Sequence, residues 1–449
     1  MLPLILTVMA LLFLMPILYK MHSVSRGWGV DYISFWVLNY IVFCFCGAVV
    51  IMLGAGDDIY FVLPFSHNEY LKLVGSSVVI FLGGGAIICF FFFFRFLGGE
   101  KPYIKLNSTT VLYSKRDIFI CDLALLFSLG IFIYCQYSIY PSPLLMAISG
   151  ESTVDIALRR IQVTKDLAEI ASTYPYAILK ILLHVLTFSY IASFVLNKNM
   201  INAIRFVFVF LLSIISLLST AEKGPIIFYL GGILMSYYFS RGVILKISFK
   251  LILISVFFLI CVYVIFVSTD IATIFSLIFD RVFIAQISAV YLSLEHYSWS
   301  GDIGFASMNN LFTKLMSYKS QSAASEELMR VYFPEMISLG GWNINGLYIH
   351  EAWSNFGVIG LLIGPLLVGF ENALLLRYIV SFNKTPLLCG FYSLFSISCT
   401  SFLTSFNSYF YDSNWLVYLV VVSLFSCFYV IYLLLHNVQH GIKMSSNIS

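Results

Sequence analysis

Charge is scarce in this sequence: only 10% of its 449 residues are Asp, Glu, Lys or Arg, whereas 60% are hydrophobic. A typical soluble protein has about 25% charged residues. The shortage excludes a soluble globular protein and predicts a chain that lies in a lipid bilayer. The net charge of +3 reflects basic residues at a cytoplasmic rim, and it does not indicate a nucleic-acid partner.

Motifs of soluble cofactor chemistry are missing as well. The sequence has no GxxxxGKS/T phosphate loop, no GxGxxG turn after a strand and no HExxH zinc motif, so we expect no ATP-driven pump within this chain. The nine cysteines lie in apolar runs without CxxC pairs, which favours small buried side chains over a disulfide framework. Because no cluster of His, Cys or carboxylate residues has metal-ligand spacing, we expect the protein to need no metal and no other cofactor.

Long apolar windows are abundant, and they recur along the whole chain. A transmembrane helix needs roughly 20 such residues, and the alternating pattern of an outer-membrane barrel is not seen. The sequence therefore predicts an all-α, polytopic integral membrane helical bundle that forms a single transmembrane domain over 1–449. We expect about eleven spans, at 2–20, 31–53, 71–96, 117–139, 174–196, 203–219, 225–239, 247–267, 352–376, 386–404 and 415–435. The first lacks a basic n-region and a cleavage site, so we expect it to be retained.

Basic and acidic residues divide between alternate connections. Cytoplasmic loops carry an excess of Lys and Arg, so the acidic set, which includes Asp57 and Asp58, is expected outside and the C-terminus inside. Two connections on that external face are long, 140–173 with an amphipathic helix and 268–351, and long loops are often functional. Within the second, 271–294 is almost long enough to span. Because Asp280 and Arg281 fall in its middle, where charge is costly, we expect an interfacial or partly inserted helix.

The stretch YIHEAWSNFGVIGLLIG at 348–364 resembles the signature region of the Wzy-type O-antigen polymerases, or oligosaccharide repeat unit polymerases. In that family an external loop ends in an acidic residue, an aromatic residue, an Asn-Phe-Gly turn and a Gly-containing helix. The stretch is also similar to the O-antigen ligases, in which a His-Asn pair leads into a GxxG helix, although Glu351 stands here in place of the Asn. A second likeness to the polymerases is LLSTAEKGPIIF at 217–228, which contains Lys223.

The resemblance implies a glycosyltransferase that joins undecaprenyl-pyrophosphate-linked oligosaccharide repeat units in lipopolysaccharide or related surface polysaccharide biosynthesis. It also implies a multi-pass protein of the bacterial inner (cytoplasmic) membrane with its active site on the periplasmic, external face. Membrane lipid, a chain-length regulator and a flippase are the further partners it implies. A lipid-linked oligosaccharide flippase and an O-antigen ligase remain the alternatives.

The reaction implied by this resemblance needs cations for the departing pyrophosphate and a base for the acceptor hydroxyl. The candidate catalytic residues are His350, Glu351 and Arg281. The candidate substrate-binding residues are Arg159, Arg160, Lys223, Tyr348, Trp353 and Asn355.

Several of these candidates have a structural alternative. Arg281 can pair with a nearby acid, and only one of the adjacent Arg159 and Arg160 can face inward on a helix. Lys223 can extend its ammonium from a helix end to water, and Trp353 can anchor at the lipid interface.

Overall fold

The computed structural model describes residues 2–25, 29–151, 155–156, 158–160, 162–163, 173–219, 224–243, 253, 257, 260, 270–307, 323–338, 344, 346–398 and 414–446. Over these residues the chain is helical and has no strand. Eight helices are long and apolar enough to cross a membrane, or up to nine if one bent pair is a single span. The prediction of an all-α, polytopic membrane fold is therefore confirmed.

The eight helices coincide with eight of the expected spans. Two further expected spans, 225–239 and 386–404, correspond to the shorter apolar helices Ile226–Ser240 and Pro386–Ser398. The expected span 247–267 lies outside the described residues, apart from isolated positions. The segment 271–294 forms two helices, Thr273–Ile284 and Ser288–His296, bent by 52°. The expectation of an interfacial or partly inserted helix stays a prediction, because such a bent pair is either a broken span or a re-entrant segment.

The helices group into two compact units, each built from separated stretches of chain. Unit 1 comprises Met1–Lys105, Lys246–Ser381 and Ser398–Ser413, and unit 2 comprises Leu106–Leu245, Phe382–Ile397 and Asn414–Ser449. Both units contain candidate membrane spans. The expectation of one transmembrane domain over the whole chain stays a prediction.

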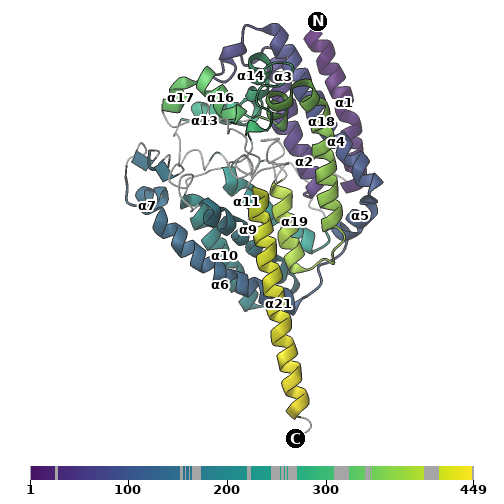
Figure 1. The fold of residues 1–449 in the computed structure, drawn as a ribbon, viewed down its shortest axis with the longest axis vertical. Helices are drawn as coiled ribbons and strands as arrows, with labels where there is room; N and C mark the ends of the chain where they lie inside the picture. The colour runs from purple at the N-terminus through teal and green to yellow at the C-terminus, as the bar shows by residue number, and fades with distance from the viewer. Residues whose placement is uncertain are drawn as a thin grey trace. The chain divides into compact units, whose positions relative to one another are not determined.

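Unit 1 is organised around one long helix, α4 (Glu69–Phe96), which contacts α1, α3, α14 and α18 (Figure 1). Its elements are α1 (Leu2–Ser25), α2 (Tyr32–Tyr40), η1 (Ile41–Phe45), α3 (Cys46–Met52), η2 (Leu63–Phe65), α13 (Ile271–Phe279), η3 (Asp280–Ile284), α14 (Ser288–His296), η4 (Gly304–Ser307), α16 (Ala324–Tyr332), α17 (Pro334–Ser338) and α18 (Tyr348–Ile379), with α5 (Glu100–Ser108) at its boundary.

Small residues let α18 approach α4 closely. A Cβ atom added to Gly369 of α18 would lie 2.7 Å from the Ala86 carbonyl oxygen and 2.7 Å from the Phe90 nitrogen of α4. Close contact of this kind favours membrane helix association, because dispersion forces and interhelical hydrogen bonds replace the hydrophobic effect. The Tyr348 hydroxyl also donates a 2.8 Å hydrogen bond to the Leu82 carbonyl of α4. The start of α18, which carries the sequence candidates, is thereby attached to α4.

Unit 2 surrounds α9 (Thr173–Leu196), which contacts α6, α10, α11 and α21. Its other helices are α6 (Lys115–Ser138), α7 (Pro143–Ile148), α10 (Met200–Ser219), α11 (Gly224–Ser240), α19 (Pro386–Ser398) and α21 (Asn414–Ser446). Asp122 of α6 accepts a 2.8 Å hydrogen bond from Tyr190 of α9 and forms an ion pair with Arg205 of α10. These three polar side chains therefore satisfy one another between helices.

We expect Gly369→Ala to lower the melting temperature of the purified protein in detergent, because the new methyl group would force α18 away from α4, at a cost of about 1–3 kcal/mol. Gly130→Ala in α6 is the matched control, since no atom lies within 4 Å of its added Cβ. Alanine there should leave stability unchanged or raise it by about 0.5–1 kcal/mol. Equal melting temperatures for the two variants would contradict the close packing of α18 on α4.

Candidate functional site

The helix α18 contains a sharp break at Gly357, where φ is 56° and ψ is −137°. A side chain makes this backbone conformation costly, so glycine is required. After the break the chain folds back on itself: a Cβ atom at Gly360 would lie 1.9 Å from the Ala352 carbonyl oxygen, and one at Gly364 would lie 3.1 Å from the Tyr348 ring. Residues 348–356 thus form a short helix, which we call the fold-back helix. The expected span at 352–376 therefore begins inside this separate helix.

A loop at 298–303 holds the break in place. The Ser354 carbonyl at the end of the fold-back helix accepts hydrogen bonds from the Asp302 and Ile303 backbone nitrogens, at 2.9 and 3.1 Å. The Trp299 carbonyl accepts a 3.1 Å bond from the Val358 nitrogen, which begins the long part of α18. These bonds satisfy backbone groups that a helix end leaves open.

The Asp302 side chain closes this loop. Its carboxylate accepts bonds from the Ser298 nitrogen and hydroxyl, at 2.7 and 2.6 Å. The two bonds lower the pKa of Asp302 below its usual value, so the carboxylate is charged at neutral pH. The loop that ends the fold-back helix is therefore stabilised by an ionised group.

The sequence candidates at 348–355 all lie on the fold-back helix and are buried. His350 is 1% exposed and lies against Gly346 and Ala289 of α14. Its Nδ1 is 2.6 Å from the Leu347 carbonyl oxygen, which assigns the proton to Nδ1. The other ring nitrogen, Nε2, is buried and has no hydrogen-bond partner among the described residues. A neutral imidazole in this tautomer presents a lone pair at Nε2, which is what a general base requires.

Trp353 does not have the environment of a lipid-interface anchor. It is 4% exposed, and its Nε1 is buried without a hydrogen-bond partner among the described residues. Its ring contacts that of Trp299 edge to face, with centroids 5.7 Å apart. Trp299 is 78% exposed, so the loop presents an aromatic face to the surroundings while Trp353 stays inside. Sequence reasoning missed Trp299, because nothing in its local pattern relates it to Trp353.

Arg281 lies on the π-helical turn η3, near the end of the helix that precedes the bend. Its side chain is exposed, and no described carboxylate pairs with its guanidinium. The alternative in which Arg281 pairs with a nearby acid is therefore not seen among the described residues. The exposed guanidinium presents its N–H donors to an anion.

The other basic candidates belong to unit 2. The Arg159 guanidinium donates to the carbonyl oxygens of Ile139, Tyr140 and Pro141, at 3.3, 3.3 and 2.9 Å. This side chain therefore holds the turn that follows α6, which is a structural role. Arg160 is exposed, and Lys223 lies outside the described residues.

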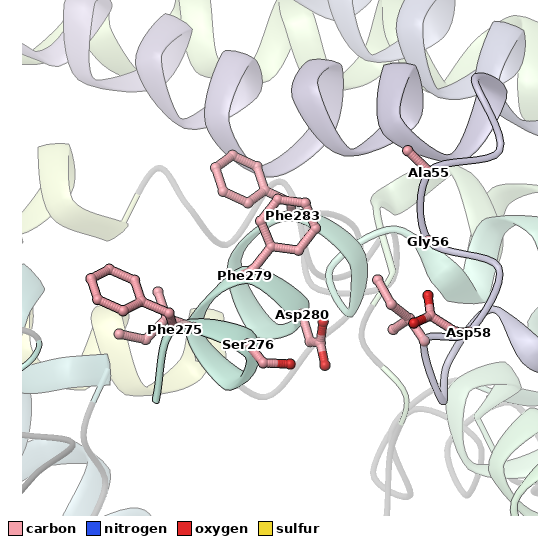
Figure 2. A pocket seen from close by; sticks show the side chains of 10 residues that line it. Ala55, Gly56, Asp58, Phe275, Ser276, Phe279, Asp280 and Phe283 are labelled. Carbon is pink, nitrogen blue, oxygen red and sulfur yellow. The ribbon is translucent and has the colours of Figure 1, made fainter. Parts of the chain in front are cut away.

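An open cleft of about 540 Å³ lies in unit 1 between the turn after α3 and the α13–η3 segment (Figure 2). Phe275, Phe279 and Phe283 line it, together with the carboxylates of Asp58 and Asp280. Sequence reasoning missed this cleft. The signal was the spacing of four residues between the phenylalanines, which places them on one helical face, but the partner segment that completes the cleft is distant in sequence.

Comparison with protein-family models, with curated proteins and with solved structures gives no match to this chain. Among the described residues, no group of three or more His, Cys, Asp or Glu side chains is placed to hold a metal ion. The seven described cysteines are free thiols. Independence from metals and cofactors stays a prediction.

We expect Gly357→Ala to destabilise the protein more than Gly98→Ala. Both glycines have a positive φ, 56° and 67°, so alanine brings backbone strain of about 1–3 kcal/mol at either position. At Gly98 no atom lies within 4 Å of an added Cβ, whereas at Gly357 the Trp299 carbonyl oxygen lies 1.9 Å away. Thermal unfolding in detergent measures the difference. Tryptophan fluorescence should shift for Gly357→Ala alone, and identical behaviour of both variants would contradict the clash.

Proposed function

We propose that this protein is a polysaccharide polymerase that joins undecaprenyl-pyrophosphate-linked oligosaccharide repeat units at the external face of the bacterial inner membrane. The resemblance of 348–364 to the Wzy-type polymerases suggests this reaction. The observation that carries the proposal is His350 on the fold-back helix, with a buried Nε2 that has no described partner. The exposed guanidinium of Arg281 in the same unit supports it.

The proposed reaction transfers a glycan from one lipid carrier to another. The acceptor hydroxyl oxygen attacks the anomeric carbon of the donor, and the bond from that carbon to the pyrophosphate oxygen breaks, so the pyrophosphate leaves with the electron pair. His350 Nε2 takes the proton of the acceptor hydroxyl. Arg281 binds the leaving pyrophosphate through parallel N–H···O bonds. Burial disfavours the imidazolium that forms at His350, and the neighbouring carboxylate of Glu351 offsets part of this cost.

The two alternatives differ from the polymerase in their chemical demands. A flippase moves the same lipid-linked ligand without breaking a bond, so it has no use for a base. A ligase would be expected to carry Asn after the histidine, where this chain has Glu351. The buried imidazole lone pair and this glutamate favour the polymerase.

The proposal includes the membrane arrangement expected from the sequence. With about eleven spans and the acidic connections outside, the 140–173 and 268–351 segments lie on the external face. The fold-back helix begins at Tyr348, at the end of the second segment. The base and the cation would then lie where repeat units arrive after crossing the membrane. Chain-length regulation and flipping would be supplied by partner proteins.

We expect Arg281→Ala and His350→Ala each to reduce polymer formation by about 100-fold or more, because each removes a group that stabilises the transition state. Arg281→Lys should recover part of the activity, since a point charge cannot reproduce the guanidinium fork. The repeat-length distribution of surface polysaccharide measures the effect in cells that depend on each variant. Single repeat units should still reach the surface.

Arg330→Ala and His296→Ala are the matched controls, because both residues lie in the same external segment and pair with acids of α16. They should give polymer of normal length. Normal polymer from both the Arg281 and the His350 variants would refute the site. Repeat units that stay inside the cell in these variants would indicate a flippase instead.

We also expect purified protein in lipid nanodiscs to polymerise lipid-linked repeat units in the presence of a chelator. Pyrophosphate is already a good leaving group, so a guanidinium is sufficient to neutralise it. Gel analysis of the products over time measures polymer formation. Activity that is lost in chelator and restored by a divalent ion would show that a metal takes part.

A further inference from the structure

The cleft between the turn after α3 and the α13–η3 segment has a composition unlike that of a phosphate site. Asp58 comes from the turn and Asp280 from η3, and Figure 2 shows both carboxylates flanking the same space. Lys72, the lysine of α4, pairs instead with Asp57 and Glu69, at 3.0 and 2.6 Å. Neither Asp58 nor Asp280 has a side-chain hydrogen bond or ion pair among the described residues. Both carboxylates are therefore available to a ligand in the cleft.

This charge excludes one ligand class and favours another. Among the described residues, no Lys, Arg or His lines the cleft, and Asp58 lies close enough to Asp280 to act on it as a like charge. A pyrophosphate would be repelled here. Unpaired carboxylates accept hydrogen bonds strongly, so they favour a ligand that carries several hydroxyl donors.

Aromatic rings form much of the remaining lining, and two of them are accessible. Phe275 is 52% exposed and Phe279 is 39% exposed, and the rings of Phe279 and Phe283 lie 5.1 Å apart. Flat apolar rings beside hydrogen-bond acceptors suit a pyranose, which has an apolar C–H face and a rim of hydroxyls. The volume of about 540 Å³ is within the range of about 300–1,000 Å³ that is usual for ligand sites.

We propose that this cleft binds the acceptor glycan of the polymerisation reaction, a neutral oligosaccharide whose hydroxyls donate to Asp58 and Asp280 and whose rings pack on Phe275 and Phe279. This inference rests on the proposed function and assigns its acceptor subsite. Asp58 and Asp280 position the acceptor and take no part in proton transfer. Arg281 directly follows Asp280 on η3, so this one turn separates the two substrates by charge: the acceptor sugar contacts the carboxylate, and the donor pyrophosphate contacts the guanidinium.

The test measures binding directly and does not depend on turnover. The probe is the free repeat-unit oligosaccharide, released by mild acid from the lipid-linked units that accumulate in cells without this chain. Calorimetry follows its binding to the full-length protein in nanodiscs, with chelator present. Asp58→Asn and Asp280→Asn should each weaken binding about tenfold or more, because each replaces a charged acceptor. Glu335→Gln, which changes an exposed carboxylate of α17 outside the cleft, is the control and should bind like the unaltered protein.

A further variant distinguishes loss of binding from loss of the folded structure. Ala55→Trp places a large side chain in the cleft at an exposed position and keeps both carboxylates. It should abolish binding while the melting temperature stays near that of the unaltered protein. If Asp58→Asn, Asp280→Asn and Ala55→Trp all bind the oligosaccharide normally, the cleft is not the acceptor subsite. Absence of binding to the unaltered protein, or binding that requires a divalent ion, would likewise overturn the inference.

Parallel polymerisation assays separate this inference from the proposed function. In the expected result the unaltered protein makes polymer, and excess free oligosaccharide inhibits the unaltered protein but not the cleft variants. If polymer forms and the free oligosaccharide inhibits all variants equally, the assignment of the acceptor subsite is overturned, whereas the proposed polymerase function still holds. If the oligosaccharide binds at the cleft but no polymer forms, the proposed polymerase function is overturned, and the acceptor role with it. The assignment of the cleft as a glycan-binding site would then still hold.

Discussion

The left-handed backbone of Gly357 is the constraint on which the candidate site depends. A straight helix through 348–379 would carry His350 and Trp353 far from α14 and from the loop at 298–303. The break instead folds 348–356 back against the long part of α18, and backbone bonds from Asp302 and Ile303 to the Ser354 carbonyl fix its end. His350 is buried against α14 as a result. The burial that leaves Nε2 without a partner among the described residues follows from one glycine and a few backbone hydrogen bonds.

The helical turn η3, between α13 and α14, has a comparable role, because it directs two opposite charges into different surroundings. A carboxylate and a guanidinium on consecutive residues of a helix point in different directions, because each residue advances the helix by about 100°. On η3, Asp280 lines the cleft and the side chain of Arg281 is exposed outside it. In the proposed reaction, an acceptor rich in hydroxyls and a donor that carries pyrophosphate would therefore bind at this single turn. A straight span would have buried both charges in lipid at a high cost.

The two features are linked through neighbouring elements of unit 1. The carbonyl of Phe283, which lines the cleft, packs against Gly47 of α3, and Ala289 of α14 packs against Gly346 next to His350. In turn, Tyr291 of α14 stacks on Phe65 and shares a 2.8 Å hydrogen bond with Ser76 of α4. The α14 helix thus joins the fold-back helix to α4, and it follows directly after η3, which carries Asp280 and Phe283 of the cleft. A shift of α14 would alter both features together.

The sequence by itself determined the class of the protein and the identity of most site candidates. Scarcity of charge and recurrent apolar windows require a helical membrane protein, because only internally bonded backbone is stable in lipid. The charges of Asp280 and Arg281 predicted an interfacial or partly inserted helix at 271–294, and the structure has a bent pair of helices whose break, at 285–287, follows these residues. Only the tertiary structure decided which polar side chains make structural contacts and which face a cleft or the surroundings. The Arg159 guanidinium donates hydrogen bonds to the carbonyl oxygens of residues 139–141, and the Tyr348 hydroxyl donates one to the Leu82 carbonyl. Asp58 and Asp280 line the same cleft. These outcomes depend on contacts between residues distant along the chain, and local periodicity contains no information about such contacts.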